Sequence, residues 1–125
     1  DVTVCGPRTL MPGGMEEIYG CRVEYNLPEA LKDADVVMGL RMQLERMTEG
    51  LFPSLEEYSK HYVLSKDTIK FAKKDALIMH PGPMNRGVEI LPEIADSDHS
   101  IIVEQVANGV AVRMALMFLI LGGKL

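Results

Sequence analysis

Short apolar runs alternate with stretches of helical periodicity through the first third of this chain, and a further apolar run follows later. Runs of this kind, bounded by turn residues, are typical of strands. Strands that alternate with helices predict an α/β fold: a doubly wound, mostly parallel sheet with helices on both faces, of Rossmann-like type. The expected strands are Val2–Cys5, Gly20–Tyr25 with its turn, Val36–Leu40 and Ala76–Met79.

Two of these strands lack any polar alternation, which is typical of strands buried inside a parallel sheet. We therefore expect Val36–Leu40 to be central in the sheet and Ala76–Met79 to be covered on both faces. Asn26 and Ser65 are suitable N-caps for short helices, and after Ser65 the side chains of Ile69 and Phe71 should face the core. The expected helices are Gly14–Tyr19, Leu27–Leu31, one after the capping-box pair Ser54 and Glu57, one after Ser65, and Val106–Leu121.

The last of these helices is apolar nearly all round, so it should be buried against the sheet or another domain. Its uninterrupted apolar run, Met114–Leu121, is far below the ~20 residues of a bilayer crossing, and we predict no membrane span. Arg113 lies on the same side of this helix as Val106 and Val110. A charge there needs a partner, and an internal ion pair is favoured over a substrate contact.

Composition and charge narrow the class of protein. The chain has 125 residues, 47% of them hydrophobic and 25% charged, which fits a single globular domain spanning 1–125. Its net charge of −5, without a basic run, argues against nucleic-acid binding. Cys5 and Cys21 have no metal-ligand spacing and no signal peptide precedes them, so we expect reduced thiols and a cytoplasmic protein. The chain opens on a strand pattern without methionine, so we expect it to be the tail of a longer protein.

The loop that follows Met79 carries the most specific chemistry in the chain. Pro81 and Pro83 donate no backbone N–H and hold the loop stiff, while Gly82 permits close approach to the backbone. Such a loop offers carbonyl oxygens to a ligand that has N–H groups. A rigid turn without a ligand fits the pattern equally well. His80 at the strand end is a possible acid or base, but we prefer a role in which its ring nitrogens hold the loop in shape.

A second polar segment follows the strand Val36–Leu40. Ligands of doubly wound sheets bind at the carboxyl ends of strands, which is where Arg41 and Gln43 lie. In an extended backbone both side chains point the same way, and a guanidinium beside an amide suits a dicarboxylate. The alternative is a solvated charged patch formed by Arg41, Glu45 and Arg46, which the residues alone favour slightly.

Together the two segments resemble one enzyme family. Residues His80–Ile90 are similar to the His-Pro-Gly-Pro loop of aspartate carbamoyltransferases, and Arg41–Arg46 is similar to their Arg-x-Gln-x-Glu-Arg segment. These enzymes transfer a carbamoyl group from carbamoyl phosphate to L-aspartate in pyrimidine biosynthesis. The resemblance implies that the chain is most of a C-terminal aspartate-binding domain. The N-terminal domain that holds carbamoyl phosphate is absent, so the fragment alone is expected to be inactive.

The resemblance also implies roles for single residues. Arg41 would pair with a carboxylate of aspartate, Gln43 would orient it, and the backbone at Gly82 and Pro83 would accept hydrogen bonds from the carbamoyl amide. Possible supporting residues are His80, Arg86 and Arg113. No catalytic residue is certain, and neither metal nor cofactor is expected, because catalysis in the family is mainly positioning and charge stabilisation. Full-length chains should form a homotrimer, with a possible regulatory or pathway-enzyme partner.

Alternatives to this interpretation remain. Ornithine carbamoyltransferases normally have cysteine after the loop histidine, where this chain has Pro81, so aspartate is favoured. A non-catalytic binding or assembly module with the same fold is a further alternative. A receiver domain is disfavoured, because Asp33 and Asp35 precede their strand instead of following it.

Two expectations concern loop conformation. Thr48–Pro53 falls where the family has a loop that moves as the active site closes. We also predict a cis Gly82–Pro83 bond, because X–Pro bonds accept cis at a cost of only about 0.5–1 kcal/mol and the loop must turn tightly after the strand. The family's loop has a cis bond at the matching position.

Overall fold

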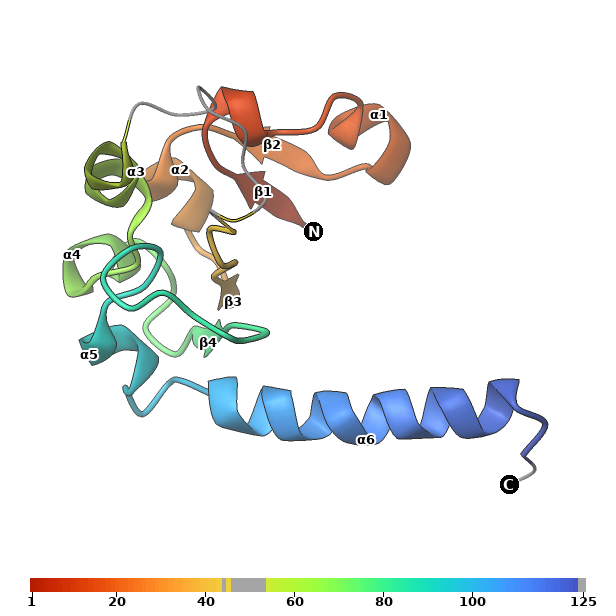
Figure 1. Ribbon diagram of the computed structural model, residues 1–125. Coiled ribbons are helices and arrows are strands. Elements are labelled where there is room, and N and C mark those ends of the chain that lie inside the picture. The colour runs from red at the N-terminus through yellow and green to blue at the C-terminus, as the bar shows by residue number, and fades with distance from the viewer. Residues whose placement is uncertain (44, 46–53, 124–125) are drawn as a thin grey trace.

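The structure is a computed structural model that describes residues 1–43, 45 and 54–123. Its strands form two parallel pairs: β1 (Thr3–Cys5) with β2 (Arg22–Glu24), and β3 (Val36–Met38) with β4 (Leu77–Met79). Parallel strands joined by helices confirm the predicted α/β class (Figure 1). Among the described residues, however, the two pairs are separate sheets and do not join into one. The moving loop expected at Thr48–Pro53 lies outside these residues, and so does Arg46.

Three of the described helices begin after a residue whose side chain caps them: Asn26, Ser54 or Ser65. The side chain of Asn26 accepts a hydrogen bond from the backbone of Glu29, and Ser65 forms a reciprocal capping box with Thr68. The helices are η1 (Arg8–Leu10, a 3₁₀ turn), α1 (Met15–Tyr19), α2 (Leu27–Leu31), α3 (Leu55–Tyr62), α4 (Lys66–Ile69), α5 (Pro92–Ala95) and α6 (Ile102–Ile120). Because α4 ends at Ile69, Phe71 lies beyond it and is 45% exposed, so its expected place in the core was wrong.

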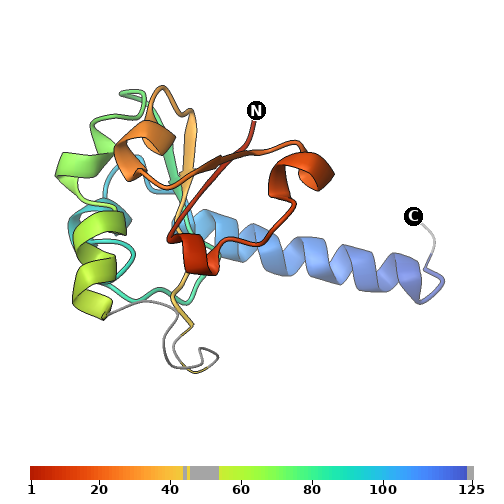
Figure 2. The same ribbon diagram turned by 90° about the horizontal axis from the view of Figure 1, so that it is seen from above.

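One face of the β3–β4 pair packs into the core and the other is open. Val37 and Ile78 point inward and are almost fully buried, whereas Val36, Met38 and Leu77 are 40–49% exposed. Alternate residues of a strand point to opposite faces, and α2, α3 and α4 lie on one side of the strands (Figure 2). The expectation that Ala76–Met79 is covered on both faces was therefore wrong. Val36–Met38 was expected at the centre of the sheet, but among the described residues it forms one edge of a two-stranded sheet. The core comprises Leu27, Leu31, Val37, Leu64, Ile78, Ile90, Ile94, Ala95 and Ile102.

Helix α6 extends away from this body (Figure 1). It begins at Ile102, four residues earlier than predicted, directly after Ser100 forms a parallel bridge with Ile78. Only Ile102 of its described residues is buried, so the expected burial of the helix is absent here. By length and composition α6 could also cross a membrane, which corrects our estimate from run length. The core helix of a soluble protein meets the same criteria of length and composition.

Candidate functional site

The two polar segments identified in the sequence lie together at the carboxyl ends of β3 and β4. The two strands are parallel and in register, Met38 opposite Met79, so the chain leaves both at the same edge. The backbone N–H of Gly39 continues the pairing with a 3.0 Å hydrogen bond to the carbonyl of Met79. A Cβ at position 39 would lie 3.3 Å from the ring of His80, so glycine allows that ring to pack here.

A side-chain hydrogen bond connects the two segments directly. The Nδ2 amide of Asn85, in the proline loop, donates to the backbone carbonyl of Met42 at 2.9 Å. Met42 is 5% exposed, while its neighbours Arg41 and Gln43 are half-buried. The alternation is that of a short extended segment, as expected. Asn85 therefore fixes the segment that carries Arg41 and Gln43 beside the proline loop.

Arg41 already binds a carboxylate within the chain. Both terminal nitrogens of its guanidinium contact Glu45: Nη1 donates to Oε2 at 3.3 Å, and Nη2 donates to Oε1. The Arg41 side chain is 25% exposed and that of Glu45 is 55% exposed. This pair matches the charged patch that the residues alone favoured. The same two-pronged geometry is the one by which Arg41 would bind a carboxylate of a ligand.

The proline loop is shaped by the histidine that opens it. His80 is fully buried, and its Nδ1 accepts a 2.9 Å hydrogen bond from the backbone N–H of Gly82. The Gly82–Pro83 peptide bond is cis, which confirms the prediction. Gly82 has φ 63°, a left-handed conformation that favours glycine. The flanking Pro81 and Pro83 are exposed, so the loop backbone faces outward while its histidine is held inside.

The two possible supporting arginines lie in different settings. Arg86 forms two hydrogen bonds to Asp96, at 2.6 and 2.8 Å, which tie the loop to the end of α5. These bonds raise the pKa of Arg86 and lower that of Asp96. Arg113 is exposed on α6 and pairs with no carboxylate of the part of the chain that the structure describes. Its expected internal ion pair was wrong there, because α6 extends away from the body (Figure 1).

Comparison with known proteins identifies the family in which this loop and segment occur together. Residues 15–120 match the family model described as aspartate/ornithine carbamoyltransferase, Asp/Orn binding domain. The chain belongs to this carbamoyltransferase family. It is 59% identical over 121 residues to the aspartate carbamoyltransferase catalytic subunit of Syntrophus aciditrophicus, and 55% identical over 123 residues to that of Syntrophomonas wolfei. These matches cover 97% and 98% of this chain but only 39% of each relative.

Solved carbamoyltransferases share the fold. Ornithine carbamoyltransferase from Pyrococcus furiosus is 26% identical with a TM-score of 0.80, covering all of this chain and 43% of that one. Aspartate transcarbamoylase from Trypanosoma cruzi is 23% identical with a TM-score of 0.72, covering 94% of this chain and 40% of that one. The chain thus spans about two-fifths of the length of the relatives it matches.

Two polar residues beside the family's loop were not singled out from the sequence. Glu89 is 2% exposed, and its Oε1 accepts a 2.5 Å hydrogen bond from the backbone N–H of Asn85. Gln105, on the first turn of α6, accepts a 2.8 Å hydrogen bond from the backbone N–H of His80. The sequence held one sign of this network: Glu89 lies between the apolar residues Val88 and Ile90. A carboxylate that is buried with such neighbours needs hydrogen-bond partners. Across residues 1–43, 45 and 54–123, no cluster of His, Cys, Asp and Glu could hold a metal ion.

Proposed function

We propose that this chain is the aspartate-binding part of an aspartate carbamoyltransferase. The whole enzyme transfers the carbamoyl group of carbamoyl phosphate to the amine of L-aspartate, giving N-carbamoyl-L-aspartate and phosphate. The observation that carries the proposal is the Asn85–Met42 hydrogen bond, which holds a guanidinium and an amide beside the proline loop at one sheet edge. The relatives at 55–59% identity named aspartate carbamoyltransferase favour aspartate as the acceptor.

Each residue then has a role in positioning. Arg41 exchanges Glu45 for a carboxylate of aspartate, and Gln43 orients the same substrate. The carbonyls at Gly82 and Pro83 accept hydrogen bonds from the carbamoyl amide. The amine nitrogen attacks the carbamoyl carbon as the bond from that carbon to the phosphate oxygen breaks. Residues of this chain contribute by aligning the reactants and balancing charge.

The assembly is part of the proposal. Full-length chains form a cytoplasmic homotrimer, with a regulatory or pathway-enzyme partner possible and with neither nucleic acid nor membrane involved. Support comes from α6, where apolar side chains such as Val110, Met114 and Phe118 are 49–66% exposed. Exposed apolar surface of this extent is typical of an interface. The remainder of the enzyme supplies that cover.

Steady-state kinetics on the full-length enzyme that contains this domain test the proposal. With carbamoyl phosphate as donor, kcat/KM should be higher for L-aspartate than for L-ornithine. A preference for ornithine would support the ornithine-type alternative, which the 26% identical Pyrococcus enzyme keeps open. Turnover of neither acceptor, by protein that is folded and binds carbamoyl phosphate, would support a non-catalytic module.

A further inference from the structure

We propose that Glu89 and Gln105 are positioning residues of this site. Together they hold His80 and Asn85 so that the proline loop keeps one fixed relation to the Arg41–Gln43 segment. The inference rests on the proposed function for the identity of the substrates. The network of contacts itself comes from the described residues alone.

The carboxylate of Glu89 is buried, and its polar contacts offset the cost of that burial. Its Oε1 accepts the backbone N–H of Asn85 at 2.5 Å and lies 3.3 Å from Nε2 of His80. Its Oε2 is buried without a hydrogen-bond partner in the part of the chain that the structure describes. Burial of a carboxylate is costly, so an apolar side chain would serve packing better at this position. The contacts of Oε1 are both made to residues of the proline loop.

The histidine ring is fixed from two sides. Because Nδ1 of His80 accepts the N–H of Gly82, the ring proton resides on Nε2 and faces the carboxylate of Glu89. Nε2 lies 3.3 Å from Oε1 of Glu89 but makes no hydrogen bond among the described residues, so the bond from Gly82 is the one that a turned ring would lose. Three contacts therefore connect the start of the proline loop to its end: Gly82 to His80, His80 to Glu89, and Glu89 to Asn85.

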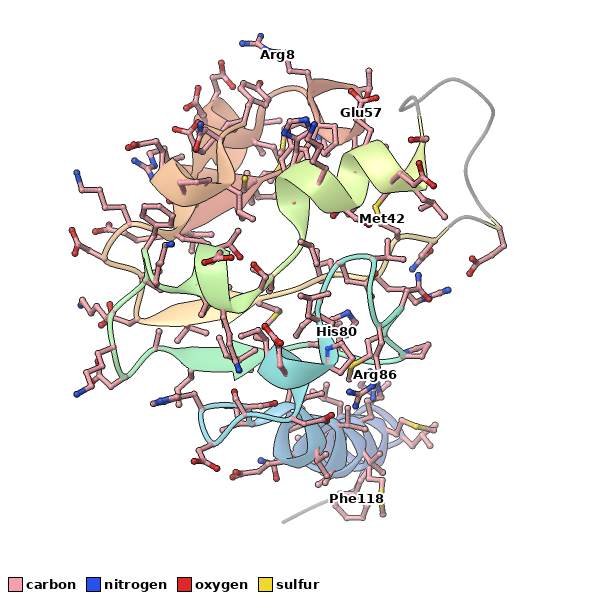
Figure 3. The ribbon with its side chains drawn as sticks, turned by 90° about the vertical axis from the view of Figure 1, so that its left-hand side faces the viewer. Arg8, Met42, Glu57, His80, Arg86 and Phe118 are labelled. Atoms are coloured by element: carbon pink, nitrogen blue, oxygen red, sulfur yellow. The ribbon has the colours of Figure 1, made fainter. Side chains whose placement is uncertain are left out.

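Gln105 connects this closed loop to α6. Its Oε1 accepts the backbone N–H of His80 at 2.8 Å, at the point where the chain leaves β4. Figure 3 views α6 along its axis and shows His80 just above the helix. On the opposite side of the loop, Asn85 donates to the carbonyl of Met42. The network thus reaches from α6 through the loop to the segment that carries Arg41.

Replacement of Glu89 by glutamine separates positioning from packing. The amide keeps the shape and can still accept the N–H of Asn85. With the amide oxygen at the Oε1 position, the negative charge beside Nε2 of His80 is lost, and the NH₂ group occupies the Oε2 position, which is buried without a hydrogen-bond partner among the described residues. If the amide turns over instead, its NH₂ group faces both the backbone N–H of Asn85 and the Nε2 proton of His80, so either orientation displaces the loop. A displacement of about 1 Å at such a site can cost about 100-fold in rate.

The test uses the full-length enzyme with Glu89→Gln and, as matched control, Glu93→Gln. Glu93 is exposed on α5 and undergoes the same chemical change four residues away. We expect Glu89→Gln to lower kcat/KM for aspartate by about 10- to 100-fold, while Glu93→Gln leaves it unchanged. ¹⁵N NMR of the histidine rings, with the His80 signals assigned through a His80→Asn variant, should show the proton of His80 on Nε2 in wild type and a changed pattern in Glu89→Gln.

A second pair of variants covers a failure of Glu89→Gln to fold. Gln105→Met removes the acceptor at similar volume, and Gln105→Glu restores an acceptor oxygen. Gln105→Met should lower kcat/KM about 10-fold or more, and Gln105→Glu should recover most of it.

The outcomes distinguish this inference from the proposed function. A wild-type His80 protonated on Nδ1 overturns the network whatever the enzyme's substrate. Unchanged kcat/KM in both Glu89→Gln and Gln105→Met overturns the positioning roles. A correct His80 tautomer in an enzyme that does not carbamoylate aspartate overturns the proposed function and leaves the network standing.

Discussion

Arg41 and Arg86 each donate two hydrogen bonds to a carboxylate, but their surroundings indicate different roles. Arg41 pairs with Glu45 and is 25% exposed, at the carboxyl end of β3 and beside the proline loop. Arg86 pairs with Asp96 at 44% exposure. A partly desolvated guanidinium at a sheet edge can exchange its carboxylate for that of a ligand, whereas the more exposed pair ties two segments together.

The first prediction concerns Arg41 in a full-length enzyme. Arg41→Ala should lose about 2–5 kcal/mol of transition-state binding to aspartate, the usual cost of removing one partner of a desolvated charge pair. The measurement is kcat/KM for aspartate at saturating carbamoyl phosphate. Lys73→Ala is the control, because Lys73 pairs with Asp35 at the other end of β3. Equal kcat/KM in Arg41→Ala and wild type would refute the assignment.

A second prediction concerns pH and the Arg86–Asp96 pair. The pair lowers the pKa of Asp96 in the folded protein below its unfolded value of about 3.9. The ionised carboxylate therefore stabilises the fold above that unfolded pKa, and the contribution is lost as pH falls through the folded pKa. Asp96→Asn should lower the free energy of unfolding at pH 7, and the deficit should shrink in acid. Urea unfolding from pH 7 downwards measures it, and a deficit independent of pH would contradict this account.

At the scale of elements, the short helix α4 packs beside the proline loop, through the residue that precedes its cap. Ser65 and Thr68 cap it reciprocally, with a 2.8 Å bond from the backbone of Ser65 to the hydroxyl of Thr68. The preceding residue, Leu64, is 4% exposed, and its backbone pairs with the carbonyl of Glu89 and the N–H of Leu91. The start of α4 thus lies against the end of the proline loop.

A third prediction follows from this cap. Ser65→Ala removes the acceptor for the backbone N–H of Thr68 and should lower the free energy of unfolding by about 1 kcal/mol. Ser59→Ala makes the same change inside α3, where no cap is lost, and should have little effect. Urea unfolding of a protein containing this domain compares them. Equal midpoints for both variants would show that the cap contributes nothing.

At the scale of the whole chain, much apolar surface is uncovered. The chain spans 39% of the length of its relatives, one face of β3 and β4 is open, and α6 extends free of the body. Residues for both carboxylate binding and carbamoyl recognition are proposed here, but none is assigned to the phosphate of carbamoyl phosphate.

The fourth prediction is therefore that the isolated 125-residue chain has no carbamoyl transfer activity. The physical reason is that both reactants must be aligned at once, and the proposed site assigns none of its residues to the phosphate of carbamoyl phosphate. Formation of N-carbamoyl-L-aspartate by the purified chain is the measurement, with the full-length enzyme as positive control. Turnover by the chain alone would contradict the prediction.

Local interactions are what the sequence by itself determined. The caps at Asn26 and Ser65 and the cis bond before Pro83 depend on residues within a few positions of one another, and the structure has all of them. The α/β class follows likewise from the order of apolar runs and helices. The proline loop and the segment at Arg41 could be recognised for the same reason, since each is continuous in sequence.

Only the tertiary structure decided what depends on distant residues. Periodicity predicts that an apolar face needs cover but not whether cover is present, so the open face of β3 and the exposure of α6 could not be foreseen. For the same reason, Arg113 has no carboxylate partner within residues 1–43, 45 and 54–123. Glu89 and Gln105 join the site through bonds to His80 and Asn85, and a buried hydrogen bond between separate elements leaves no periodic trace in the sequence.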